Sequence, residues 1–315
     1  MAERVCPGLA ADWLNAWLAA VGSTVLDDRI QLHWTPEPVP LAVLSVDGDD
    51  DPADVLIAAW PNRERLAAMP VACECPGLPR MGRKVHVDVF RERVRAARSH
   101  SDSWTLSSTV TDLHVDDDGE ASHAPLDPPG PGPTGSLHDR LLKSHKHVDS
   151  PPEQVLATLE GRASRVVDNG LGFDLARVTG QADKSQKTVD PAVEVLAFFG
   201  LALLPVRGDG TDQRMPGARS RTSTRQRGWR TTPPRRFEWP AWLQPLDREG
   251  IDALLDAWHD SLPPMHRPGP DEERAAPKHN RAPWERLGVH AAWRTVGYQS
   301  RSRSDPTRGY GSEPL

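Results

Sequence analysis

The N-terminal part of the chain alternates apolar and polar positions in ways that predict a helix followed by a β-hairpin. Residues 12–21 carry tryptophan, leucine and valine at helical spacing, and Gly22 is the expected end of that helix. Residues 29–34 alternate apolar with polar side chains, as a half-buried strand does. A proline-containing turn follows, and residues 41–46 are predicted to return as a second strand.

The longest strongly apolar run, residues 189–206, predicts the centre of the core. Asp190 is placed to cap a helix that begins at Pro191, and Gly200 is expected to close it in the left-handed conformation. Apolar residues cover nearly the whole circumference, so we expect this helix to be buried. Residues 201–206 then predict a short strand. No catalytic motif accompanies the run.

Start signals mark further helices. Asp51 is expected to cap a helix that begins at Pro52. Residues 150–153 (SPPE) form a capping box for a helix whose buried face extends to Val167. Residues 136–147 and 247–258 carry apolar positions at helical spacing and predict two more helices.

Helices and short strands alternate irregularly, which is typical of the α+β class. Residues 85–90 and 104–124 contain β-prone pieces, while residues 90–98 fit either a strand or a helix. A doubly wound sheet would need a more regular strand–helix alternation. We therefore predict an α+β fold of mixed helices and short, mainly antiparallel strands, followed by a disordered proline-rich C-terminal tail.

Proline and glycine divide the chain into regions. The 315 residues include 31 prolines and 24 glycines, and 37% are hydrophobic, so long connections are expected. Residues 127–135 (DPPGPGPTG) are predicted to be a linker or exposed loop between an N-terminal α+β region, 1–126, and a helical and β region, 136–262. Residues 263–315 contain eight prolines and no sustained apolar period, and are predicted to be the disordered tail.

Cysteine content and hydropathy bear on location. Cys6, Cys73 and Cys75 cannot form a disulfide framework, and their odd number indicates a reducing compartment. The N-terminus lacks the apolar core of a signal peptide, and no run reaches the ~18 apolar residues of a membrane span. We therefore expect a cytoplasmic protein with no membrane partner.

Two His-Asp pairs are the strongest candidates for chemistry. His138–Asp139 and His259–Asp260 each supply an imidazole and a carboxylate, which suit a divalent cation that activates water. Nothing specifies the further His and Asp ligands that such a site needs, so we interpret them as ordinary residues near helix ends. We expect no catalytic residue, no metal site and no cofactor, and we keep a metal-dependent nuclease or phosphohydrolase as an alternative.

An arginine-rich segment is the best functional candidate. The chain has a net charge of −6, but residues 207–236 contain nine arginines, no lysine and two acidic residues, interleaved with Gly, Ser, Thr and Pro. Guanidinium groups bind phosphates bidentately and stack on bases, and a tryptophan adds a stacking surface. The alternative is a solvated loop whose charge balances acidic loops elsewhere. The predicted nucleic-acid-binding residues are Arg225, Arg227, Trp229, Arg230, Arg235 and Arg236.

Several short signatures together resemble a known family. They are residues 7–9 (PGL), 12–22 (DWLNAWLAAVG), 108–113 (STVTDL), 135–141 (GSLHDRL), 190–200 (DPAVEVLAFFG) and 237–242 (FEWPAW). The combination is similar to CRISPR-associated proteins of type I-G systems, formerly called I-U. Within these it resembles the small proteins grouped as an extension of the helicase–nuclease, which are related in pattern to the large subunits.

The resemblance implies a non-enzymatic role in antiviral defence. The family brings no catalytic residues to transfer, and the chain has neither a phosphate-binding Gly-Lys-Ser/Thr loop nor helicase motifs. It implies a subunit or accessory protein that contacts RNA, DNA, other effector subunits or the helicase–nuclease. A protein-interaction scaffold is a further alternative.

Overall fold

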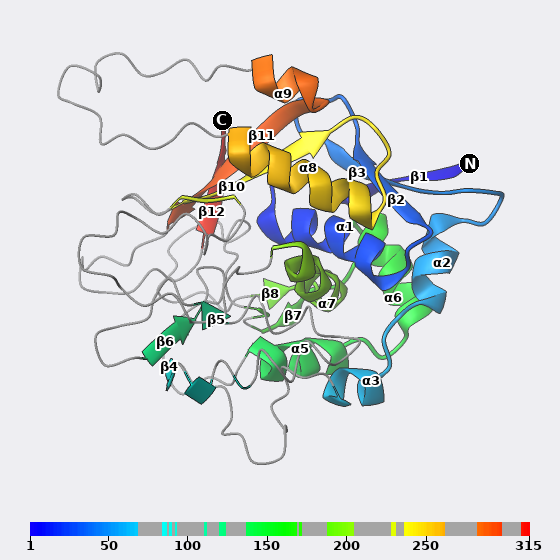
Figure 1. Cartoon of the computed structure of the whole chain (residues 1–315). Helices are drawn as coiled ribbons and strands as arrows, with labels where there is room; N and C mark the ends of the chain where they lie inside the picture. The colour runs from blue at the N-terminus through cyan, green and yellow to red at the C-terminus, as the bar shows by residue number, and fades with distance from the viewer. Residues whose placement is uncertain are drawn as a thin grey trace.

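The computed structural model has an α+β fold built around two buried helices (Figure 1). Helices and short antiparallel strands in open sheets make up the fold, which confirms the predicted class. The structure describes residues 1–68, 84–86, 88–89, 92, 110–111, 120–123, 137–168, 170–171, 188–204, 228–230, 236–261, 282–297 and 310–315.

The first sheet has the strand order β1-β3-β2 and is antiparallel throughout. Strands β2 (Ile30–Trp34) and β3 (Leu41–Val46) confirm the predicted hairpin. Strand β1 (Ala2–Ala10) was not predicted, because exposed and partly exposed residues occupy its first half and Pro7-Gly8 interrupts the pattern. Alternate residues of β2, including Leu32, are fully buried on the core face, whereas β3 is buried at every position from Ala42 to Val46.

The second sheet overturns part of the predicted disordered tail. Its order is β12-β11-β10-β9, and it consists of β9 (Trp229–Arg230), β10 (Arg236–Trp242), β11 (Val289–Gly297) and β12 (Tyr310–Pro314). Two of these strands and helix α9 (Ala282–Arg286) lie within residues 263–315. The proline content of that region hid β11, whose Trp293 and Thr295 are buried against the core.

Indole N–H groups connect the elements of this core. Trp17 donates to the carbonyl of Pro240 at 2.8 Å, Trp239 to that of Ala11 at 2.7 Å, and Trp242 to that of Leu32 at 2.9 Å. A two-way backbone bridge between Leu32 and Leu246 also connects the first sheet to the segment after β10. These three tryptophans therefore bury large apolar areas while satisfying their own polar atoms.

Helices α1 (Leu14–Leu26) and α7 (Pro191–Gly200) cross with their backbones in direct contact. A Cβ on Gly22 would lie 1.9 Å from the carbonyl oxygen of Leu196, and a Cβ on Gly200 would lie 2.1 Å from that of Leu18. Figure 1 shows α1 between α7 and helix α8 (Arg248–Ser261). Every residue of α7 is buried, as its apolar circumference predicts.

This contact corrects two predicted helix ends. Helix α1 continues through Gly22 to Leu26, and Gly200 is right-handed, with φ −60°, rather than left-handed. Both glycines are required by close helix packing, and neither ends its helix through a positive φ. The segment after Gly200 is also a 3₁₀ helix, η4 (Leu201–Leu203), instead of the predicted strand.

The predicted caps have mixed outcomes. Asp51 caps α2 (Pro52–Ala58) by accepting from Ala53 N at 2.8 Å, and Asp190 caps α7. The Ser150 side chain makes no cap hydrogen bond on α6 (Pro151–Leu159), so the predicted capping box is wrong. The Gln154 side chain accepts from Ser150 N instead.

The predicted length of α6 is also wrong. The helix ends at Leu159, because Gly161 follows with φ +73°, and Val166–Val167 forms strand β7, paired with β8 (Thr188–Val189). The remaining elements are α3 (Arg63–Ala68), α5 (Leu137–Lys146), β4 (Lys84–His86), β5 (Val110–Thr111) and β6 (Glu120–His123).

Residues from both sides of the predicted linker share one hydrophobic core. Leu18 and Val21 of α1 belong to the same buried cluster as Leu196 and Phe199 of α7. The linker itself, residues 127–135, lies outside the described residues. Within the described ranges, no helix has the length and apolar character needed to cross a membrane.

Replacing Gly22 with alanine should strongly destabilise the protein, because the new methyl would meet the Leu196 carbonyl rather than a movable side chain. We expect Gly22→Ala to lower the free energy of unfolding by about 3 kcal/mol or more. Urea denaturation measures the change. Gly311→Ala is the control, since its Cβ would have no neighbour nearer than 3.9 Å, and equal losses in the two variants would contradict the close-packing argument.

Candidate nucleic-acid interface

Two buried residues lie just before and within the arginine-rich segment. Leu204, which follows η4, is 1% exposed, and Gly228, which precedes β9, is also buried. Three of the predicted nucleic-acid-binding residues, Arg225, Arg227 and Arg235, lie outside the described residues. The structure places the other three in the β9–β10 hairpin, Trp229 and Arg230 in β9 and Arg236 at the start of β10.

The hairpin sets Arg230 directly opposite Arg236, and Trp229 opposite Phe237. Gly228 holds its base in place with φ +72°, and its carbonyl accepts from Glu238 N at 2.8 Å. A Cβ at this position would lie 2.4 Å from the Glu238 carbonyl oxygen, so only glycine fits here. The two arginines are therefore held by backbone pairing at the edge of the second sheet.

His259, from one of the two His-Asp pairs, supports this hairpin. Its Nδ1 accepts a hydrogen bond from Gly228 N at 3.3 Å. Its ring thus connects α8 to the hairpin, a role that sequence alone did not indicate. His138 and Asp139 fall in α5 and Asp260 falls in α8. Among the described residues, no group of three or more His, Cys, Asp or Glu side chains is arranged to hold a metal ion.

A buried polar cluster at the crossing of α1, α5 and α7 was missed by the sequence argument. Glu194, 2% exposed, accepts from Asn15 Nδ2 at 2.7 Å with one carboxylate oxygen and from Leu171 N at 2.7 Å with the other. Gly170 lies against it with φ +51°, where a Cβ would be 2.4 Å from the Glu194 carboxylate. The only hint in the sequence is a glutamate within a helix that is otherwise apolar.

Helix α5 adds cations to the same cluster. Arg140 donates to the Leu171 carbonyl at 2.6 Å, and burial lowers its pKa, which the Asp168 and Glu194 charges oppose. Asp168 lies 2.8 Å from Lys143 Nζ and 3.4 Å from His147 Nε2, and accepts from Gly170 N at 3.0 Å. These contacts hold Asp168, Gly170 and Leu171 between α5 and α7, so the cluster connects structural elements.

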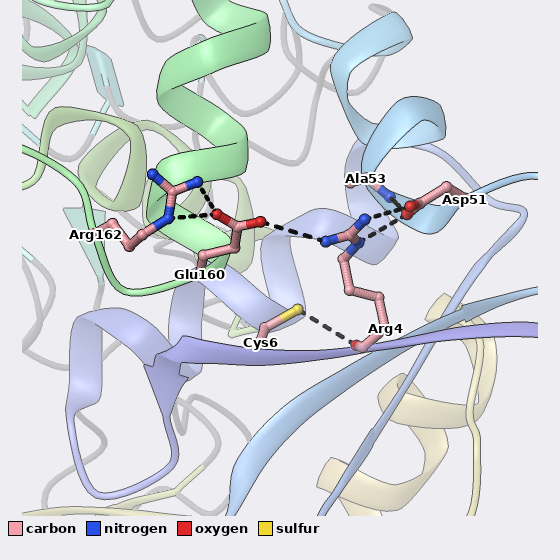
Figure 2. Close-up of polar contacts among 6 residues, drawn as sticks. All are labelled: Arg4, Cys6, Asp51, Ala53, Glu160 and Arg162. Atoms are coloured by element: carbon pink, nitrogen blue, oxygen red, sulfur yellow. Dashed lines mark hydrogen bonds and ion pairs between the residues drawn. The ribbon is translucent and has the colours of Figure 1, made fainter.

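A second polar group joins β1 to two helices at the surface (Figure 2). The Arg4 guanidinium forms an ion pair with Asp51, with a further Nε–Oδ1 hydrogen bond of 2.8 Å, and lies 3.9 Å from Glu160. The hydrogen bond from Arg4 lowers the pKa of Asp51. All three side chains are about one-third exposed, so the energetic gain is modest, about 0–1 kcal/mol per pair.

Cys6 lies beside this group, and its thiol is unreactive. Its Sγ is 3.5 Å from the Arg4 carbonyl oxygen, and burial raises the pKa of the thiol to about 12 (Figure 2). A thiol that stays protonated is a poor nucleophile and a poor metal ligand. Cys6 is therefore a packing residue of β1, while Cys73 and Cys75 lie outside the described residues.

Asp190 is the buried cap that fixes the start of α7. One of its oxygens accepts from Ala192 N at 3.0 Å, and the hydroxyl of Thr158 lies 3.0 and 2.9 Å from the two carboxylate oxygens. Burial raises the pKa of Asp190, although these hydrogen bonds oppose the rise. Ionised Asp190 therefore costs folding free energy, and this cost is relieved as the pH falls through its raised pKa towards the ordinary value.

Thr158→Val should destabilise the protein more at neutral than at acid pH. The variant removes a hydroxyl donor to ionised Asp190, which we expect to lower the free energy of unfolding by about 1–3 kcal/mol at neutral pH. The loss should shrink near pH 4, close to the ordinary pKa of a carboxyl, about 3.9. Denaturant unfolding across pH measures it, and Thr158→Ser is the control because it keeps the donor. Identical pH profiles for the two variants would contradict this role.

No protein-family model matches the sequence, and no curated protein matches it either. Function must therefore be inferred from this chain's own residues. Within the described ranges, the polar clusters around Glu194 and Arg4 connect secondary-structure elements to one another. The arginine-rich segment stands out by its charge, nine arginines against two acidic residues.

Proposed function

We propose that this protein is a non-enzymatic subunit or accessory protein of a type I CRISPR antiviral apparatus and that it contacts nucleic acid through residues 207–236. Its site of action is the cytoplasm. Its partners are other effector subunits or the helicase–nuclease, as the resemblance to type I-G proteins implies. Chemistry on the nucleic acid belongs to another subunit, and this chain supplies binding.

The observation that carries the proposal is the local charge of this segment. Nine arginines against two acidic residues lie within a chain whose net charge is −6. A segment that served only solubility would carry both signs of charge. A segment rich in arginine alone is suited to binding phosphate groups, because a guanidinium binds phosphate bidentately. Leu204, just before the segment, and Gly228, within it, are both buried.

The hairpin gives a second line of support. Arg230 and Arg236 occupy directly opposite positions in an antiparallel pair, where like charges destabilise the sheet. An anion between two such positions would turn that repulsion into attraction. Retaining two arginines at opposed positions is therefore easier to understand if a phosphate group binds there.

Removing the arginines should weaken nucleic-acid binding and its salt dependence together. We expect the variant with Arg225, Arg227, Arg230, Arg235 and Arg236 all changed to alanine to lose affinity for single-stranded RNA and DNA. Each phosphate that is no longer neutralised should reduce the slope of log K against log salt by about 0.7. Fluorescence anisotropy across a salt series measures both quantities, for single and for double strands.

Two smaller variants sharpen this test. Arg230→Ala with Arg236→Ala removes only the opposed pair of the hairpin, and should account for up to about 1.4 of the change in slope. Arg63→Ala with Arg248→Ala is the matched control, because both arginines are exposed on helices elsewhere. If the variant with all five arginines changed keeps the affinity and salt slope of the wild type, the segment does not bind nucleic acid and this proposal is wrong.

A further inference from the structure

The second sheet has one buried face and one face that reaches solvent along β11 and β12. Phe237, Trp239 and Trp293 are at most 4% exposed and pack in the hydrophobic core. Because side chains alternate along a strand, the residues between them belong to the other face. On that face the Arg294 side chain is 30% exposed and the Glu313 side chain is 40% exposed. We call this the outer face of the second sheet.

The strand register places three arginine positions on the outer face. Arg230 pairs with Arg236 across β9 and β10. Arg294 pairs with Glu238, which lies two residues along β10 from Arg236. Positions 236 and 294 are therefore diagonal neighbours on one face, about 7–8 Å apart. Arg294 thus extends the opposed arginine pair of the hairpin onto β11.

The same end of the sheet carries another arginine-bearing connection. Antiparallel pairing sets Arg236 at the end where β11 finishes with Gly297, and Gly297 pairs with Tyr310, where β12 begins. The two connections that start and finish at this end, residues 231–235 and 298–309, contain four arginines and one aspartate. Both connections therefore bring a net positive charge in their sequence to the end of the sheet that holds the hairpin arginines.

Glu313 is the carboxylate that a phosphate bound at Arg294 would meet. Arg294 Nε donates to Glu313 Oε1 at 2.5 Å across β11 and β12. Glu238, on the other side of Arg294, is only 7% exposed and is shielded from a ligand at the surface. A guanidinium has five N–H donors, so Arg294 can keep its bond to Glu313 while it also binds a phosphate. The Glu313 charge would then repel that phosphate.

We infer that Arg294 is a further phosphate contact for the nucleic acid and that the charge of Glu313 weakens this binding. The inference rests on the proposed function, because it takes the same ligand, but its residues lie outside the segment 207–236. The alternative is an ion pair that only fastens β12 to β11. The two accounts differ in one respect, since an ion pair with a structural role alone predicts no gain of binding when the Glu313 charge is removed.

Two substitutions that keep size and polarity test this inference. Glu313→Gln keeps an oxygen that can accept from Arg294 Nε but removes the charge, and should raise the affinity for single-stranded oligo(dT) and oligo(rU) by about two- to five-fold at low salt. Arg294→Gln should lower the affinity and reduce the slope of log K against log salt by about 0.7. Fluorescence anisotropy across a salt series measures both quantities.

The Arg248–Glu249 ion pair is the matched control, because it joins the same residue types on α8. Arg248→Gln and Glu249→Gln should each bind as the wild type does. Circular dichroism checks that each variant is folded. If Arg294→Gln does not fold, Glu313→Gln still decides, because a loss of structure would not produce a gain of affinity.

The inference is overturned if Glu313→Gln binds no more tightly than Glu249→Gln, if folded Arg294→Gln binds as the wild type does, or if the wild type binds neither strand. The variant with five arginines of the segment 207–236 changed decides the proposed function separately. If that variant loses binding while the Arg294 and Glu313 variants match their controls, only the role of Arg294 and Glu313 is wrong. If it keeps binding while these two variants shift the affinity, only the role of the segment is wrong.

Discussion

The backbone contact between α1 and α7 is the constraint on which the rest of the fold depends. Two helices approach this closely only where no Cβ stands between them, and Gly22 and Gly200 each remove one. Around this crossing pack the first sheet through Leu32 and Leu44 and the second sheet through the indole of Trp17. Because interiors are close-packed, a shift of this pair would displace every layer that rests on it.

The sequence predicts those parts of the fold that local chemistry decides. Strand β2 follows from its alternation of apolar and polar residues, and the Asp51 and Asp190 caps follow from a carboxylate placed before a proline. A glycine near the end of a predicted helix is ambiguous, because glycine is favoured both where a helix ends and where two helices cross closely. Only the partner helix reveals that Gly22 and Gly200 serve the crossing.

Long-range pairing explains the elements of the structure that the sequence did not predict. Strands β1 and β11 have weak patterns of their own, and they become strands because β3 and β10 offer unpaired edges. The Glu194 cluster brings together Asn15, Arg140 and Leu171, which lie far apart in the chain, so no local motif could indicate it. By contrast, a run of arginines is visible from composition alone, and the structure adds that Arg230 and Arg236 are paired in the β9–β10 hairpin.

The pairing of β10 with β11 also orders events during synthesis. Strand β10 carries Phe237, Trp239 and Trp242, yet its partner strand follows only after a long intervening stretch of chain. Until the ribosome has released β11, the nascent chain presents an aromatic strand with an open edge, which is prone to pair with other chains. Contacts so distant in sequence also slow folding. The completed second sheet is thus a late product of translation, and the arginine hairpin at its edge gains its full support only once β11 has emerged.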